Sequence, residues 1–135
     1  MTGIAERPTI ASPKAALTSR QRLSLRNHLT ADREQTRRML ERMTNDMAAF
    51  VSARNDAPTD DEHDPEGPTL AFERSQAQAM RAQSEQHILE IDRALMRLDA
   101  GTYGLCTRCG NAIAVGRLQV RPQAALCIRC AETVR

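Results

Sequence analysis

Apolar positions recur with helical spacing along two stretches, 19–53 and 69–100, that contain no proline or glycine. The first stripe comprises Leu25, Leu29, Thr36, Leu40, Met43, Met47 and Phe50. The second comprises Ile88, Ile91, Leu95 and Leu98, with the smaller Ala77 and Met80 nearer its start. Spacings of three, four and seven place residues on one face of an α-helix. The pattern predicts two helices, each with a narrow apolar face.

Signals at the ends of both stretches support these helices. Thr18 followed three residues later by Gln21 fits a capping box at the start of the first helix. Gly101 stands where the second helix needs a C-cap. The segment 55–68 contains three prolines and a glycine, which end one helix and turn the chain before the next. At 1.5 Å per residue the first helix would be roughly 50 Å long.

Two such helices joined by a short loop can bury their stripes as an antiparallel coiled-coil hairpin, which we expect to be monomeric. Antiparallel pairing fixes the order of contacts along the hairpin. Near the turn we expect Met43, Met47 and Phe50 to face Phe72 and Met80, and at the base we expect Leu25 and Leu29 to face Leu95 and Leu98. The alternative is an intermolecular coiled coil of separate straight helices, against which the proline-rich break argues.

Composition limits the fold to one mainly helical domain without a thick interior. Only 2% of the 135 residues are aromatic, and such side chains dominate most compact cores. The longest apolar runs fall far short of the roughly 20 residues that cross a bilayer, so we expect no membrane span. The first 16 residues lack the apolar core of a secretory signal. We read residues 1–18 as a flexible tail of a cytoplasmic protein.

Charge is distributed unevenly along the chain. The net charge is +2, yet six of the seventeen acidic residues lie in the segment 55–68, which has no lysine or arginine. The acids placed at this tip of the hairpin include Asp60, Asp61, Glu62, Asp64 and Glu66. A basic body with one acidic spot favours a partner that has both kinds of surface over simple nucleic-acid coating.

Four cysteines form two C-x-x-C pairs, Cys106 with Cys109 and Cys127 with Cys130, separated by seventeen residues. This spacing is typical of a four-cysteine zinc ribbon or finger. Without an export signal the thiols stay reduced and more often bind metal than form disulfides. Four thiolates complete a tetrahedron with no position for water, so we predict one structural Zn²⁺. A thioredoxin-like redox pair would need a βαβ setting, which is missing here.

Residues around the cysteines fit this interpretation. Gly104 and Gly110 flank the first pair, where tight turns need an unhindered backbone. Nearby arginines can offset the −2 charge of a four-thiolate zinc site; these are Arg108, Arg117, Arg121, Arg129 and Arg135. The three histidines are not assigned to the metal. We expect His28 and His87 to be solvated or interfacial, and His63 to be a polar residue of the tip.

The C-terminal pattern resembles the zinc-finger signature of the DksA/TraR family. The residues that carry the resemblance are Gly101 to Cys106, Cys109, Gly110, Ile113, Arg117, Leu118, Pro122 and Cys127 to Cys130. The match covers roughly the last 35 residues, and the preceding hairpin extends it loosely to about Ser19. The chain is identified as a member of this family, with a hairpin over 19–100 and a zinc-finger module over 101–135.

The resemblance implies a bacterial transcription factor that binds RNA polymerase. Family members insert the hairpin into the secondary channel, so that tip acids approach the active centre and change the lifetime of promoter complexes. The family's Asp-x-x-Asp-x-Ala tip pattern is met only in part, because Asp61 and Asp64 have the spacing but Glu66 replaces the alanine. Members often act with the alarmone ppGpp. The C-terminal helix of longer members is missing here, which leaves a role for ppGpp open.

Two other classes of protein remain as alternatives. A zinc-finger DNA-binding protein would use the arginines around the finger, but no recognition helix follows the second C-x-x-C pair. A structural coiled-coil adaptor would explain the helices but would not need the clustered acids. We expect neither direct DNA binding nor catalysis, because the sequence has no nucleophile–base constellation and no phosphate-binding glycine loop.

Overall fold

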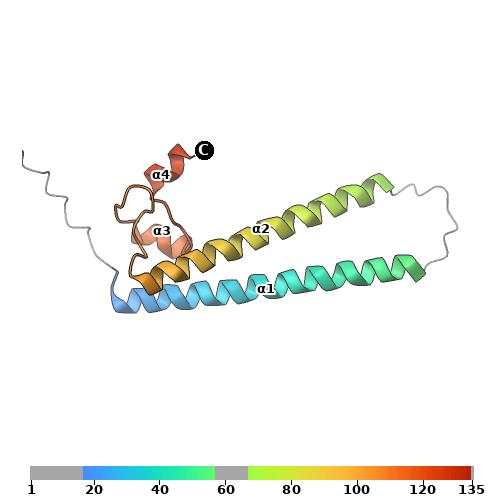
Figure 1. Cartoon of the computed structure of the whole chain (residues 1–135), viewed down its shortest axis with the longest axis horizontal. Helices are drawn as coiled ribbons and strands as arrows, with labels where there is room; N and C mark the ends of the chain where they lie inside the picture. Colours follow the sequence, from blue (N-terminus) through green and yellow to red (C-terminus); the bar gives the residue numbers. More distant parts are fainter. Residues whose placement is uncertain (1–16, 57–66, 135) are drawn as a thin grey trace, which may run out of the picture. The chain divides into compact units, whose positions relative to one another are not determined.

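The computed structural model describes residues 17–56 and 67–134. The chain forms two long helices, α1 (Ser19–Asp56) and α2 (Gly67–Ala100), followed by two short ones, α3 (Val115–Val120) and α4 (Ile128–Thr133) (Figure 1). Within the described ranges, β-type pairing is limited to an isolated bridge between Leu105 and Ala112. The predicted mainly helical fold, a helical hairpin with a C-terminal four-cysteine module, is confirmed.

The chain divides into two compact units, and both long helices contribute to each. Unit 1 contains the described residues up to Thr30 and those from Glu90 onward, and unit 2 is Ala31–Leu89. In unit 1 the start of α1 lies beside the end of α2, where Arg26 and Asp99 form an ion pair at 2.8 Å. In unit 2 the later part of α1 pairs in the same antiparallel sense with the earlier part of α2 (Figure 1).

Local sequence chemistry sets the ends of the helices in unit 1. The Thr18 backbone N–H donates to Gln21 Oε1 at 2.9 Å, and the Gln21 N–H donates to Thr18 Oγ1 at 3.1 Å. These reciprocal bonds confirm the predicted capping box. At the end of α2, Gly101 adopts a φ of 77°, and the Thr102 N–H reaches the Arg97 carbonyl at 2.9 Å. This Schellman ending also confirms the predicted glycine cap.

The helix ends that face the turn lie slightly beyond those predicted. α1 continues to Asp56 rather than Ala53. α2 begins at Gly67, so that Pro68 lies in its first turn. Proline is tolerated there because the first N–H groups of a helix have no intrahelical partner.

Unit 1 contains the hydrophobic core. Nine buried apolar residues form one cluster: Leu17, Leu25, Leu29, Ile91, Ala94, Tyr103, Cys106, Ile113 and Leu118. Leu95 and Leu98 pack against this cluster, which contains Leu25 and Leu29. Residues from α1, α2 and the cysteine module thus share one interior, which anchors the module to the helices.

Unit 2 is different, because its buried residues in the described part of the chain are the polar Thr36 and Ser84. Between the helices, His87 Nε2 lies 2.8 Å from Asp32 Oδ2, and Thr36 Oγ1 donates to Asp32 Oδ1 at 3.3 Å. The prediction that His87 is solvated or interfacial is confirmed on the interfacial side. Nothing in the described helices is long and apolar enough to cross a membrane.

One predicted pairing in unit 2 is wrong. Phe72 and Met80 are 69% and 50% exposed, and the α2 residues across from Met47 and Phe50 include Leu70 and Ala77 instead. On α2 the side across from Met47 and Phe50 carries Leu70 and Ala77 together with the charged Glu73 and Arg74. Hydrophobicity alone therefore selected the wrong face of the helix at this end.

Candidate metal centre

The four cysteine sulfurs meet at one point of unit 1. All four Sγ atoms lie within 4.8 Å of one another, and Cys109 Sγ is 3.7 Å from Cys127 Sγ. The first pair, Cys106 and Cys109, lies in the turn after Leu105, and the second pair lies at the start of α4. Two segments far apart in sequence thus supply one cluster of four thiols.

The first cysteine pair is held by a tight backbone turn. The Cys106 N–H donates to the Asn111 carbonyl at 2.8 Å, and the Gly110 N–H donates back to the Cys106 carbonyl at 2.9 Å. Gly110 has a φ of 75°, which side-chain-bearing residues rarely adopt. The predicted need for glycine at this position is confirmed. The turn aims both sulfurs to the same side of the backbone.

The second pair is positioned by α4. Cys127 is the N-cap of this helix, and its carbonyl accepts the Ala131 N–H at 2.9 Å. Cys130 follows within the first turn of α4, so that both thiols lie near the helix start. The two halves of the site are tied together by the Thr107 N–H, which donates to the Ala125 carbonyl at 2.9 Å.

The spacing of the sulfurs fits a tetrahedral zinc ion. With Zn–S bonds of about 2.3 Å, tetrahedral geometry separates ligand sulfurs by about 3.8 Å. The 3.7 Å between Cys109 and Cys127 matches this edge, and the other pairs need only small movements. Disulfide bonds would require about 2.05 Å, and all four cysteines are free. The cluster therefore fits a single structural zinc, which leaves no position for water or substrate.

The environment of the thiols prepares two of them for metal binding. Burial opposes ionisation of Cys106, but the N–H groups of Cys109, Cys127 and Arg108 outweigh it and lower its pKa to about 6. The backbone N–H of Cys130 is the main cause of a lowered pKa at Cys127. Burial, followed by interactions with the neighbouring thiols, raises the pKa of Cys130 to about 12. A bound cation would favour the thiolate at all four positions.

Two of the predicted arginines have structural roles in the module. Arg117 Nε donates to the Leu126 carbonyl at 3.0 Å, and an Arg108 guanidinium nitrogen donates to Thr133 Oγ1 at 2.7 Å. They connect the first half of the module to the segment around α4. Arg121 and Arg129 are exposed, and Arg135 lies outside the described residues.

Gly104 stands at a close approach between the module and the start of the chain's described part. Its φ is 89°, and a Cβ there would lie 3.2 Å from Leu17 Cδ1. The close approach brings the start of the module against the residue that precedes the capping box. The sequence predicted that glycine is needed at position 104, but it did not predict the contact of this position with Leu17.

Other predicted functional residues lie elsewhere. His28 is exposed on α1, and His63 lies outside the described residues, as do the proposed tip acids Asp60, Asp61, Glu62, Asp64 and Glu66. Tyr103 lies in the segment that carries the family resemblance, but the sequence analysis assigned it no role; its buried hydroxyl donates to the Pro122 carbonyl at 2.8 Å. As the only tyrosine of the chain, it offered a signal that could have been followed.

Two long antiparallel helices followed by a closed four-cysteine site define a helical-hairpin protein with a C4-type zinc finger. Residues 101–134 match the family described as the prokaryotic dksA/traR C4-type zinc finger. Similarity to known proteins, both in sequence and in fold, agrees with this match. Residues 101–134 thus form a zinc finger of the dksA/traR type.

Curated relatives and a solved structure share this pattern. The RNA polymerase-binding transcription factor DksA of Caulobacter vibrioides is 36% identical over 62 residues, which are 44% of each chain. An uncharacterized protein of Aquifex aeolicus is 49% identical over 45 residues, 33% of this chain and 31% of the relative. The chain thus matches less than half the length of these relatives. The structure of transcription factor DksA2 from Pseudomonas aeruginosa aligns with a TM-score of 0.70 and 25% identity, over 86% of this chain and 84% of that one.

Proposed function

We propose that the protein is a cytoplasmic regulator that binds RNA polymerase and modulates transcription initiation by inserting its hairpin tip into the secondary channel. The observation that carries the proposal is the combination of a dksA/traR-type zinc finger with a hairpin whose fold matches DksA2 over 86% of the chain. The Caulobacter relative is itself named an RNA polymerase-binding transcription factor. In this proposal the protein acts as a monomer and performs no catalytic step.

In this proposal the zinc site, the helices and the tip acids have different roles. The zinc site is closed, so it supports the base of the hairpin and supplies no Lewis-acid chemistry. The helices supply length, since the 38 residues of α1 correspond to about 55 Å of helix. The acids Asp60, Asp61, Glu62, Asp64 and Glu66 would act at the tip, where negative charge suits a centre that holds metal ions and basic groups.

The test separates binding from effect. We expect the double variant Asp61→Asn, Asp64→Asn to bind polymerase with nearly unchanged affinity but to lose its effect in an abortive-initiation assay. Within a channel, each charge contributes about 1 to 4 kcal/mol, which is enough to change promoter-complex lifetime tenfold. Neutralising Asp60, Glu62 and Glu66 one at a time maps which acids act.

A matched control removes two carboxylates of the helices, Glu34 and Glu85. Each is exposed and paired with an arginine one turn away on its own helix, so its neutralisation costs little stability. Full activity of the tip variant, or wild-type protein that binds duplex DNA tightly and polymerase not at all, would refute the proposal. Running the assay with and without ppGpp shows whether the alarmone takes part.

A further inference from the structure

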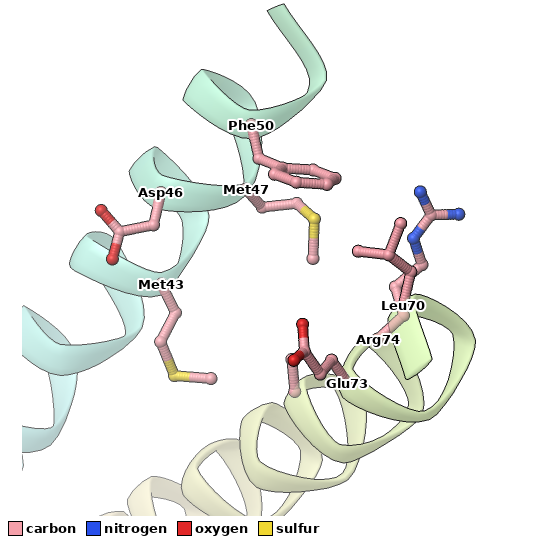
Figure 2. A pocket seen from close by; sticks show the side chains of 8 residues that line it. Met43, Asp46, Met47, Phe50, Leu70, Glu73 and Arg74 are labelled. Atoms are coloured by element: carbon pink, nitrogen blue, oxygen red, sulfur yellow. The ribbon is translucent and has the colours of Figure 1, made fainter. Parts of the chain in front are cut away.

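An open apolar groove lies between α1 and α2 within unit 2 (Figure 2). Its volume is about 300 Å³, and its apolar walls are formed by Met43, Met47 and Phe50 of α1 and by Leu70 and Ala77 of α2. Figure 2 shows Met47 and Phe50 pointing from α1 toward the side of Leu70, with space left between them. Met47 and Phe50 remain 37% and 42% exposed. The helices therefore leave apolar surface uncovered at the place where they should bury it.

Three charged side chains border the groove. Asp46 lies on the α1 side, and Glu73 and Arg74 lie on the α2 side. In Figure 2 the Glu73 carboxylate extends into the gap between the two helices. Among the described residues, none of these three forms an ion pair. The border thus carries two free carboxylates and one free guanidinium, with a net negative charge.

We propose that this groove receives an apolar side chain of RNA polymerase that stands next to a lysine or arginine. The proposal rests on the proposed function and names the surface of the hairpin that the polymerase contacts. The apolar walls favour an aliphatic or aromatic anchor, because burying exposed apolar area is the main driving force of association. Glu73 favours a basic neighbour of that anchor by charge complementarity.

The same charges disfavour two other occupants. In a symmetric dimer the same patch meets itself, which would place Asp46 and Glu73 of one copy near those of the other and cost binding energy through like-charge repulsion. Nucleic acid would bring phosphates to a groove that is apolar and net negative. A protein surface that is basic and apolar avoids both penalties.

The first experiment measures the affinity of the full-length protein for purified bacterial RNA polymerase. Met47→Gln keeps the side-chain length but makes the wall polar, and we expect about tenfold weaker binding. Glu73→Lys should weaken binding by a similar factor. The matched controls are Phe72→Gln, on the same turn of α2 but 69% exposed and outside the groove, and Glu85→Lys. Both should bind within about twofold of wild type.

A groove-filling variant tests whether weaker polymerase binding could result from loss of fold. Ala77→Leu adds apolar volume where space is open, so it should leave helix content unchanged or raise thermal stability while still weakening polymerase binding. A destabilised hairpin cannot produce that combination. Ala77→Leu that binds as tightly as wild type would overturn the proposal.

Methionine oxidation provides a second readout on the wild-type protein. In the complex, Met47 should be protected from peroxide, whereas Met96, which is 68% exposed on α2, should stay reactive. If wild type fails to bind polymerase at all, both the proposed function and this inference fall. If wild type binds and the groove variants bind equally well, only the groove assignment falls. A dimer of the free protein that Ala77→Leu dissociates would assign the groove to a second copy and overturn the proposal.

Discussion

The hydroxyl of Tyr103 gives a sharp test of how the zinc module is held in unit 1. The residue is 8% exposed, and its O–H donates to the carbonyl of the buried Pro122 at 2.8 Å. Tyr103→Phe keeps the ring and removes the donor, so the Pro122 carbonyl loses this partner. A buried acceptor left unsatisfied costs about 1 to 3 kcal/mol. We expect the free energy of unfolding to fall by that amount.

The pH dependence of this difference checks its cause. Burial raises the pKa of Tyr103 to about 12, while the charge of Arg97 acts in the opposite direction. An unfolded tyrosine ionises near pH 10, so folding favours the neutral phenol. This contribution to stability is complete below about pH 10 and is lost as the pH rises toward 12. Because phenylalanine does not titrate, the advantage of wild type over Tyr103→Phe should shrink between pH 10 and 12.

Cobalt substitution makes the measurement specific to the module. Thiolate-bound Co²⁺ absorbs visible light, so its loss during a urea titration reports on the cysteine site rather than on total helix content. Tyr103→Leu, which also removes the ring, should cost more than Tyr103→Phe. Equal urea midpoints for wild type and Tyr103→Phe would show that the hydrogen bond contributes nothing. A difference that stays constant from pH 10 to 12 would show that the phenol is not kept neutral by burial.

Two further predictions concern the same unit. Cys109→Ser should abolish stoichiometric zinc, measured by metal analysis under reducing conditions, and should loosen residues 101–134 while most of the circular-dichroism helix signal remains; retention of one zinc per chain would contradict it. Gly104→Ala should destabilise more than Gly101→Ala, because both glycines have positive φ but only Gly104 would push a Cβ to 3.2 Å from Leu17. We expect about 1 kcal/mol for Gly101→Ala, and thermal melts that rank the two variants the other way would contradict the packing argument.

Features that depend on local chemistry could be predicted from the sequence. The capping box of Thr18 and Gln21 and the glycine ending at Gly101 involve residues only a few positions apart, so their geometry follows from short-range rules. The zinc site could also be predicted from the sequence, although its two cysteine pairs are seventeen residues apart. Four thiols with this spacing commonly bind one zinc ion. The ion brings together two cysteine pairs whose contact the sequence pattern alone does not fix.

Features that depend on tertiary packing were predicted less well. The wrong assignment of Phe72 arose because large apolar residues were expected to face the partner helix, whereas Ser84 and Ala94 take buried positions on α2. The Asp32 to His87 contact spans 55 positions, and no local signal marks it. The hydrogen bond of Tyr103 was missed for the same reason, since its acceptor at Pro122 becomes a neighbour only after the module folds.

The distribution of burial gives the two units different tasks. Every apolar residue that is buried in the described part of the chain lies in unit 1, where the helices and the zinc module share one core. Unit 2 buries Thr36 and Ser84 instead and keeps its groove open. Polar groups between helices contribute less net stability than apolar packing, but they fix one register, because a shift would leave Asp32 and His87 without each other. Filling the groove with apolar side chains would stabilise unit 2 and remove the surface proposed to bind polymerase. Weak packing at this place is therefore what a binding surface requires, and stability is supplied by unit 1.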